Sequence, residues 1–206
     1  MKTFNKNLSV IGTALIATLA GSASAETVTV PVTLTVDNTI AFTQTGTLDF
    51  GTLRATADGS AAVNCVGLTM PANPASALNA TLGTAGSTAC TATGTAVIQN
   101  VGGTPTRPEF AVAGLAPFTV LTLTLPTTAD LALNPAPAGA PIFRLLDFTA
   151  YQSSGTPGAV TTTVTADNVG DIAFTVGATI ITDPTTASLQ YENTSYTGDF
   201  DVTVSY

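Results

Sequence analysis

The sequence predicts an all-β protein, an antiparallel β-sandwich, and three observations support this fold class. Threonine occurs 41 times among 206 residues, and Thr favours strands over helices. Apolar and polar residues alternate with a period of two in several segments, which is the pattern of half-buried strands. Gly, Pro and Asn separate these segments, and no segment has a convincing helical period. About ten short strands separated in this way indicate a sandwich or a barrel.

Residues 1–25 have the features of a secretory signal peptide. Two lysines precede a short apolar core at residues 8–20, and residues 23–25 read Ala-Ser-Ala, an A-x-A cleavage pattern. The apolar core is too short to span a bilayer comfortably. We therefore expect cleavage after residue 25, export to the periplasm or the cell surface, and one mature domain over residues 26–206.

The mature chain begins with the clearest alternation in the sequence. Val and Leu alternate with Thr and Pro over residues 27–36, and Ile40 and Phe42 continue on the same parity. Pro31 has no N–H for a sheet ladder, so this segment is expected at a sheet edge or inserted into another sheet. We refer to residues 27–36 as the candidate donor strand. Its apolar positions are Val28, Val30, Val32, Leu34 and Val36.

The next part of the chain predicts three short strands. They cover residues 48–53, 61–70 and 90–98, and Gly51 is expected to mark a bulge in the first of them. Residues 75–82 are the one stretch that could form a helical turn or two.

The two cysteines, Cys65 and Cys90, lie in the second and third of these predicted strands. Because an exported protein meets an oxidising compartment, we expect them to form a disulfide that joins the two strands. Closing a loop of this length would stabilise the fold by roughly 3–4 kcal/mol in the chain-entropy description.

The second half of the mature chain continues as strands. A proline-rich loop is expected at residues 134–141, and a hairpin turn is expected within residues 152–158. The predicted strands are residues 109–115, 118–125, 144–151, 159–166, 172–176 and 178–181.

The C-terminal segment is a further alternating strand. Its polar positions, which include Asp199 and Asp201, are expected to face solvent. Its apolar positions are expected to face the core of the sandwich. These are Phe200, Val202, Val204 and Tyr206.

The composition argues against several classes of function. Without histidine the chain has no Ser-His-Asp triad, no Cys-His dyad and no His-ligated zinc. The mature chain keeps three arginines and no lysine against 13 acids, and this net charge of −10 repels the backbone of nucleic acids. Pairs such as Asp167 with Asp171 lack the acid density of a Ca²⁺ site. We therefore expect no catalysis, no cofactor, no metal, no nucleic-acid partner and no membrane span after signal cleavage.

Three stretches of the mature chain resemble one bacterial family. They are the Leu-Asp-Phe-Gly-Thr-Leu segment at 48–53; the Pro-Glu-Phe-Ala-Val-Ala-Gly segment at 108–114 with its continuation at 121–126; and residues 176–180 with the terminal segment 196–206. On these residues the chain resembles the family known as domain of unknown function 4402, and the resemblance spans residues 39–206. It implies an exported, immunoglobulin-like or pilin-like sandwich, a surface or fimbrial component with no catalytic residues.

These observations favour a structural function at the cell surface. The first hypothesis is a pilin-like fimbrial subunit that gives its candidate donor strand to a like subunit, which requires a sandwich open along one edge. The second is a monomeric secreted adhesive or binding module, in which the same strand pairs within its own domain and the ligand is unknown. A minor alternative is a small outer-membrane barrel, because the terminal alternation resembles a closing barrel strand, although the aromatic girdles are lacking.

Overall fold

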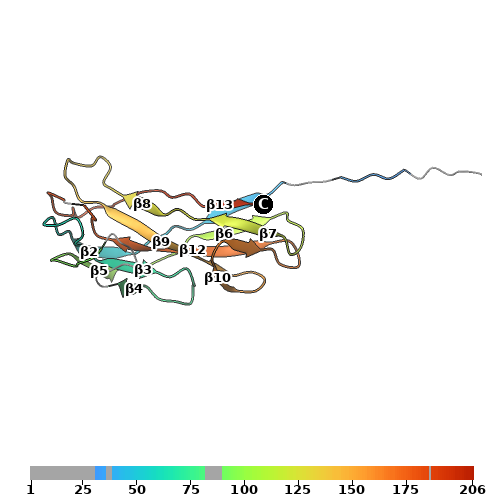
Figure 1. The fold of residues 1–206 in the computed structure, drawn as a ribbon, viewed down its shortest axis with the longest axis horizontal. Coiled ribbons are helices and arrows are strands. Elements are labelled where there is room, and N and C mark those ends of the chain that lie inside the picture. The colour runs from blue at the N-terminus through green and yellow to red at the C-terminus, as the bar shows by residue number, and fades with distance from the viewer. Residues whose placement is uncertain (1–30, 36–38, 82–89, 186) are drawn as a thin grey trace, which may run out of the picture. The chain divides into compact units, whose positions relative to one another are not determined.

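The computed structural model describes residues 31–35, 39–81, 90–185 and 187–206. The chain divides into two units, Met1–Val36 and Asp37–Tyr206. Every strand that the structure describes lies in the second unit, and no helix occurs among the described residues (Figure 1). The strands pair antiparallel and the sheets pack on one another, which confirms the prediction of an all-β sandwich.

The largest sheet has eight strands: β1 (Ala41–Thr45), β3 (Gly67–Met70), β4 (Asn79–Thr81), β6 (Glu109–Ala113), β8 (Thr128–Leu131), β9 (Phe143–Gln152), β10 (Gly158–Val160) and β12 (Ile172–Ile181). It is built around the two strands of ten residues, β9 and β12, which pair along most of their length. The outer edge of β12 takes β6 along its first half and β3 along its second half. The outer edge of β9 takes β10 near its end and β8 near its start. β1 continues the sheet beyond β6, and β4 continues it beyond β3.

A bulge in the middle of β9 lets residues before it and after it face the same core. The register with β12 shifts between Gly177 and Thr179, and Asp147 in the bulged stretch of β9 takes a positive φ of 51°. The extra residue reverses the parity of β9, so Leu145 before the bulge and Ala150 after it both face the core. The face of a ten-residue strand is thereby preserved across an irregularity.

A three-stranded sheet covers the inner face of β6 and β12. It places β7 (Val120–Thr124) between β11 (Thr163–Thr165) and β13 (Thr203–Ser205). Leu121 and Leu123 of β7 are buried and Thr122 between them is exposed, which is the predicted alternation. These leucines pack with Phe110 and Phe174 in the largest apolar cluster of the described residues.

A two-stranded sheet covers the other end of the large sheet. It consists of β2 (Thr52–Thr56) and β5 (Val97–Gly102), whose residues Leu53 and Ile98 pack against a second apolar cluster. This cluster includes Met70 of β3 and Ile180 of β12. The long strand β12 therefore contributes to both clusters, and it links the two ends of the sandwich.

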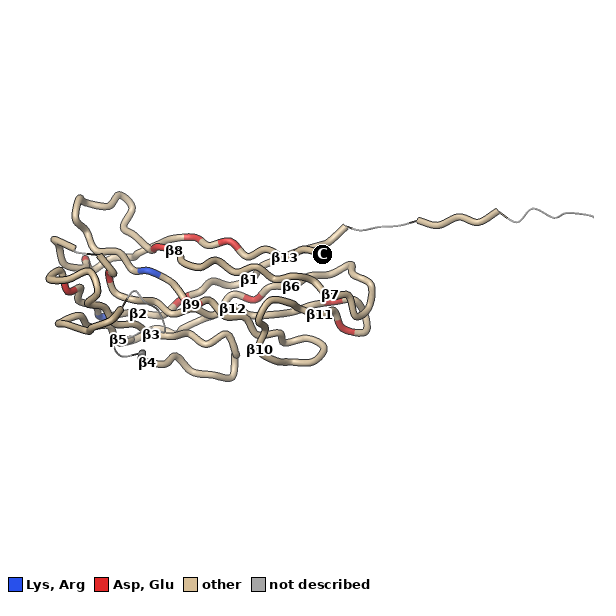
Figure 2. The backbone as a smooth tube through the Cα atoms, in the orientation of Figure 1, with Lys and Arg blue, Asp and Glu red and all other residues tan. Residues whose placement is uncertain are grey.

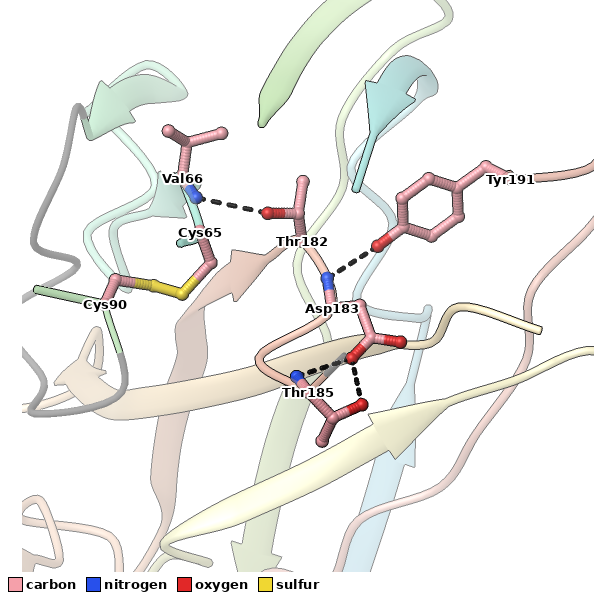
Figure 3. The surroundings of a disulfide bond; sticks show 7 residues. All are labelled: Cys65, Val66, Cys90, Thr182, Asp183, Thr185 and Tyr191. Carbon is pink, nitrogen blue, oxygen red and sulfur yellow. Dashed lines mark hydrogen bonds between the residues drawn. A yellow bond between two sulfur atoms is a disulfide. The ribbon is translucent and has the colours of Figure 1, made fainter. Parts of the chain in front are cut away.

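The predicted disulfide is confirmed (Figure 3). It lies on the face of the large sheet away from the two apolar clusters. Cys65 and Cys90 are fully buried against Leu146 and Ile181. Next to them the chain is tied to the end of β12, because the N–H of Val66 donates to the hydroxyl of Thr182 at 3.1 Å. The cross-link thus fastens an irregular segment to the sheet.

Several predicted boundaries were wrong. The cysteines precede strands instead of lying in them, because β3 begins at Gly67 and β5 begins at Val97. The predicted strand at 48–53 is displaced to β2, since Gly51 takes a φ of 78° and interrupts the extended chain. No helix forms over the described part of residues 75–82, where the chain turns and then enters β4.

Two further differences concern how strands are divided. Residues 172–176 and 178–181 are one strand, β12, because Gly177 is extended and remains in the ladder. The single strand expected at 159–166 is instead two strands, β10 and β11, which belong to different sheets. Strand β8 was not predicted at all.

Candidate functional site

The inner face of the large sheet is incompletely covered at its edge strand β1. Phe174 of β12, Phe110 of β6 and Phe42 of β1 form a row of stacked rings, with ring centres 5.1 Å and 5.7 Å apart from one ring to the next. Their exposed fractions rise along the row from 1% to 7% to 37%. Among the described residues β1 pairs only with β6, so its outer ladder edge is vacant.

The opposing sheet ends in the same way at β13. Leu121 and Leu123 of the central strand β7 are buried, whereas Val204 of β13 is only half-buried. Phe200 and Val202, which precede β13, are half-buried too and contact the same apolar cluster. In the described chain β13 has one ladder partner, β7.

Both of these edges lie on one side of the sandwich. β11 follows β10 after two residues, so the β11 edge of the small sheet lies on the β10 side of the large sheet. The β13 edge must then lie on the opposite side, beside β1, where Figure 2 also places it. Apolar side chains that are only partly covered line this seam, which we call the open edge. They are Ile40, Phe42, Phe200, Val202 and Val204.

The C-terminal strand was expected to turn four apolar residues toward the core, and the structure contradicts this for Tyr206. Phe200, Val202 and Val204 face the core but stay half-buried. Tyr206 is 68% exposed, because the ladder with β7 ends at Ser205 and the last residue lies beyond it.

The candidate donor strand is described only over residues 31–35. None of these residues is in a strand and all five are exposed. The side chains of Val32 and Leu34 are 89% and 85% exposed. The other apolar positions of the candidate donor strand, Val28, Val30 and Val36, lie outside the described residues.

The buried carboxylates serve the fold. Asp183 accepts hydrogen bonds from the N–H and hydroxyl of Thr185 (Figure 3). It also accepts one from the N–H of Ile142 at 2.9 Å. The hydroxyl of Tyr191 accepts from the N–H of Asp183 and donates to the carbonyl of Ile142, both at 2.7 Å. Burial raises the pKa of Tyr191 well above its usual value, so the phenol stays protonated and keeps this bridge.

Asp58 closes a loop beside the disulfide in a similar way. Its carboxylate accepts from the hydroxyl and N–H of Ser60, the N–H of Thr95 and the amide of Asn64. These hydrogen bonds, that of the Ser60 hydroxyl first, hold the pKa of Asp58 well below its usual value. Each of its two carboxylate oxygens accepts two hydrogen bonds from the loop, so the side chain has no acceptor site left for a ligand.

The described residues offer no assembled metal site. In residues 39–81, 90–185 and 187–206, no group of three or more Cys, Asp or Glu side chains is placed to hold a metal ion. Within the same ranges no helix is long and apolar enough to cross a membrane.

Comparison with known proteins identified no relative of this chain. No family model, no curated protein and no solved structure matches this chain. The function must therefore be argued from the open edge and the surrounding chemistry.

Proposed function

We propose that this protein is an exported structural subunit of the cell surface that assembles by strand donation. The candidate donor strand of one copy would occupy the open edge of the next copy, between β1 and β13. The observation that carries the proposal is the rise in exposure from Phe174 to Phe42, which marks a core that ends without a covering strand.

The composition of the two edge strands supports this function. Edge strands of sheets are normally protected by charged residues, Pro or bulges, because their free N–H and C=O groups template pairing with other chains. Neither Ala41–Thr45 nor Thr203–Ser205 contains a charged residue or a proline. An added strand would find free backbone groups on β1 and apolar side chains behind them.

The candidate donor strand has complementary properties. Its apolar residues occur at every second position, so one face can enter the open edge while Thr faces solvent. Burying a Val or Leu side chain contributes roughly 1.5–3 kcal/mol, and strand addition also supplies main-chain hydrogen bonds. Val32 and Leu34 are exposed, so burying them against a partner would supply this stabilisation.

The alternative is a self-complemented monomer, in which the same strand folds back onto its own β1. Residues 37–40 would then form the connecting turn. Both arrangements fill the same edge with the same strand, and they differ only in whether the strand comes from a second copy. A test must therefore separate stoichiometry from occupancy.

Occupancy can be tested with a chain that lacks residues 27–36 and a synthetic peptide of that sequence. We expect the truncated chain to bind the peptide and to gain thermal stability from it. A peptide with Leu34→Asp should bind far more weakly, because it places a charge in the apolar edge. If the truncated chain ignores the peptide, the proposed edge site is wrong.

Stoichiometry can be tested on the full mature chain by size-exclusion chromatography with light scattering, and on an unboiled denaturing gel. Strand donation predicts a ladder of oligomers that collapses to one band on boiling and is lost in Leu34→Asp. The matched control is Val101→Asp, which changes an exposed valine of β5 outside the open edge. A wild-type chain that stays monomeric while its truncated form binds the peptide would identify the self-complemented module instead.

A further inference from the structure

A cleft of about 460 Å³ lies apart from the open edge, where three loops meet. One wall comes from the loop before β7, one from the β9–β10 turn and one from the loop between β11 and β12. The residues that matter for its chemistry are Phe118, Gln152, Thr156, Thr165, Asp167 and Asn168. Its size lies within the range of small-molecule sites, about 300–1,000 Å³.

Phe118, in the loop before β7, contributes an exposed aromatic ring to the cleft from a strained backbone conformation. Its φ is 61°, in the left-handed region that bulky residues rarely adopt, and its side chain is 68% exposed. The conformation is held by a hydrogen bond of 3.1 Å from the N–H of Phe118 to the carbonyl of Asp167. The ring therefore does not contribute to the core, although the chain accepts strain to present it.

The floor of the cleft is fixed before any ligand arrives. Gln152 is buried, and its amide nitrogen donates to the carbonyls of Thr165, at 2.8 Å, and of Ser154, at 3.0 Å. Its amide oxygen accepts from the N–H of Thr165 at 3.0 Å. The amide thus ties the end of β9 and the turn after it to the end of β11, and it holds these walls of the cleft in a set position.

Asp167 offers an acceptor that the fold does not use up. Its Oδ1 accepts from the N–H groups of Val169 and Asp171 at 2.9 and 3.0 Å. Within the described residues no hydrogen bond reaches Oδ2. Backbone donors, that of Asp171 first, lower the pKa of Asp167, so the carboxylate is ionised at neutral pH.

This set of groups suits a neutral sugar. A sugar ring presents hydroxyl donors to a carboxylate and to the amide of Asn168, while its C–H face, slightly positive, meets the negative face of an aromatic ring. The cleft has no Arg, Lys or His, and the chain is strongly acidic, so phosphates and acidic sugars are disfavoured. We propose that this cleft binds a neutral saccharide, stacked on Phe118 and hydrogen-bonded by Asp167 and Asn168.

The test is binding of a panel of neutral methyl glycosides and short oligosaccharides to the full mature chain, by ligand-observed NMR and calorimetry. We expect at least one glycan to bind, and Asp167→Asn to weaken it by about 10- to 100-fold through loss of charge-assisted hydrogen bonds. Asparagine keeps the Oδ1 acceptor that orders the loop, so this variant should fold.

Phe118→Gly separates a binding role from a packing role. Glycine adopts a positive φ without strain, so the variant should keep or raise the melting temperature while glycan binding falls at least as far as in Asp167→Asn. Tyr206→Ala is the matched control, since Tyr206 is equally exposed and lies outside the cleft.

Three results would overturn the inference: no neutral glycan binding at millimolar concentration, binding that survives both cleft variants, or a lowered melting temperature in Phe118→Gly with unchanged binding. The inference does not rest on polymerisation. Leu34→Asp should therefore bind the glycan like the wild type, so failure of strand donation and failure of the sugar site can be told apart.

Discussion

Replacing Cys65 and Cys90 together by alanine removes the cross-link that ties the chain before β3 to the chain before β5. The two cysteines are 25 residues apart in sequence. In the chain-entropy description, a loop of this length restricts the unfolded chain by about 3.5 kcal/mol at 25 °C. The sulfur atoms are also fully buried against Leu146 and Ile181, so their loss leaves small voids that cost about 1 kcal/mol more.

The expected sum of about 4–5 kcal/mol corresponds to a fall in melting temperature of about 10–15 °C for a domain of this size. Thermal and urea unfolding followed by circular dichroism would measure it. Reduced wild-type protein, which keeps both sulfur atoms, should show the chain-entropy part alone. The urea m-value should rise, because the unfolded chain without the cross-link exposes more surface. A fall of less than 1 kcal/mol in the free energy of unfolding would refute the reasoning, since it would mean that the disulfide does not restrict the unfolded chain.

Two further predictions concern a close contact and a titrating group. Gly177→Ala should strongly lower the yield of folded protein and the melting temperature, because the new Cβ would lie 2.2 Å from the carbonyl oxygen of Met70. Gly158→Ala is the control and should be nearly neutral, because nothing lies within 4 Å of its Cβ. The folded pKa of Asp58 lies below the ordinary 3.8, chiefly through the Ser60 hydroxyl, so its ionised form stabilises the fold above that pH. The stability of the wild type should therefore fall as the pH drops below 3.8. Asp58→Asn should be less stable at neutral pH, and its stability should depend less on pH in acid titrations monitored by circular dichroism. An unchanged dependence of stability on pH in this variant would contradict the assignment.

The local sequence pattern was sufficient to predict a strand wherever one face of the strand is buried and the other is exposed to solvent. The alternation around Leu121 and Leu123 predicted β7, and that around Phe110 and Val112 predicted β6, because a period of two assigns the faces without knowledge of the partner. The disulfide was predictable as well, since only two cysteines are present.

Local pattern failed where the outcome depends on which strands meet. β8 does alternate, but over only four residues, which is too short a run to predict a strand by itself, and its place is set by pairing with the first half of β9. Residues 159–166 look like one strand, yet they cross from the large sheet to the small one after Val160. Neither result is encoded in the segment itself.

The sequence alone determined the class of fold, the alternating strands and the cross-link, because these follow from composition and nearest neighbours along the chain. The open edge and the cleft required the tertiary structure. Phe42 and Phe174 occupy similar alternating patterns, yet one is at an edge strand and the other at the centre of the sheet. Phe118 and Asp167 lie in two separate loops and Gln152 ends β9, and only the fold brings the three together. Exposure and convergence are properties of long-range pairing, which no local window of sequence contains.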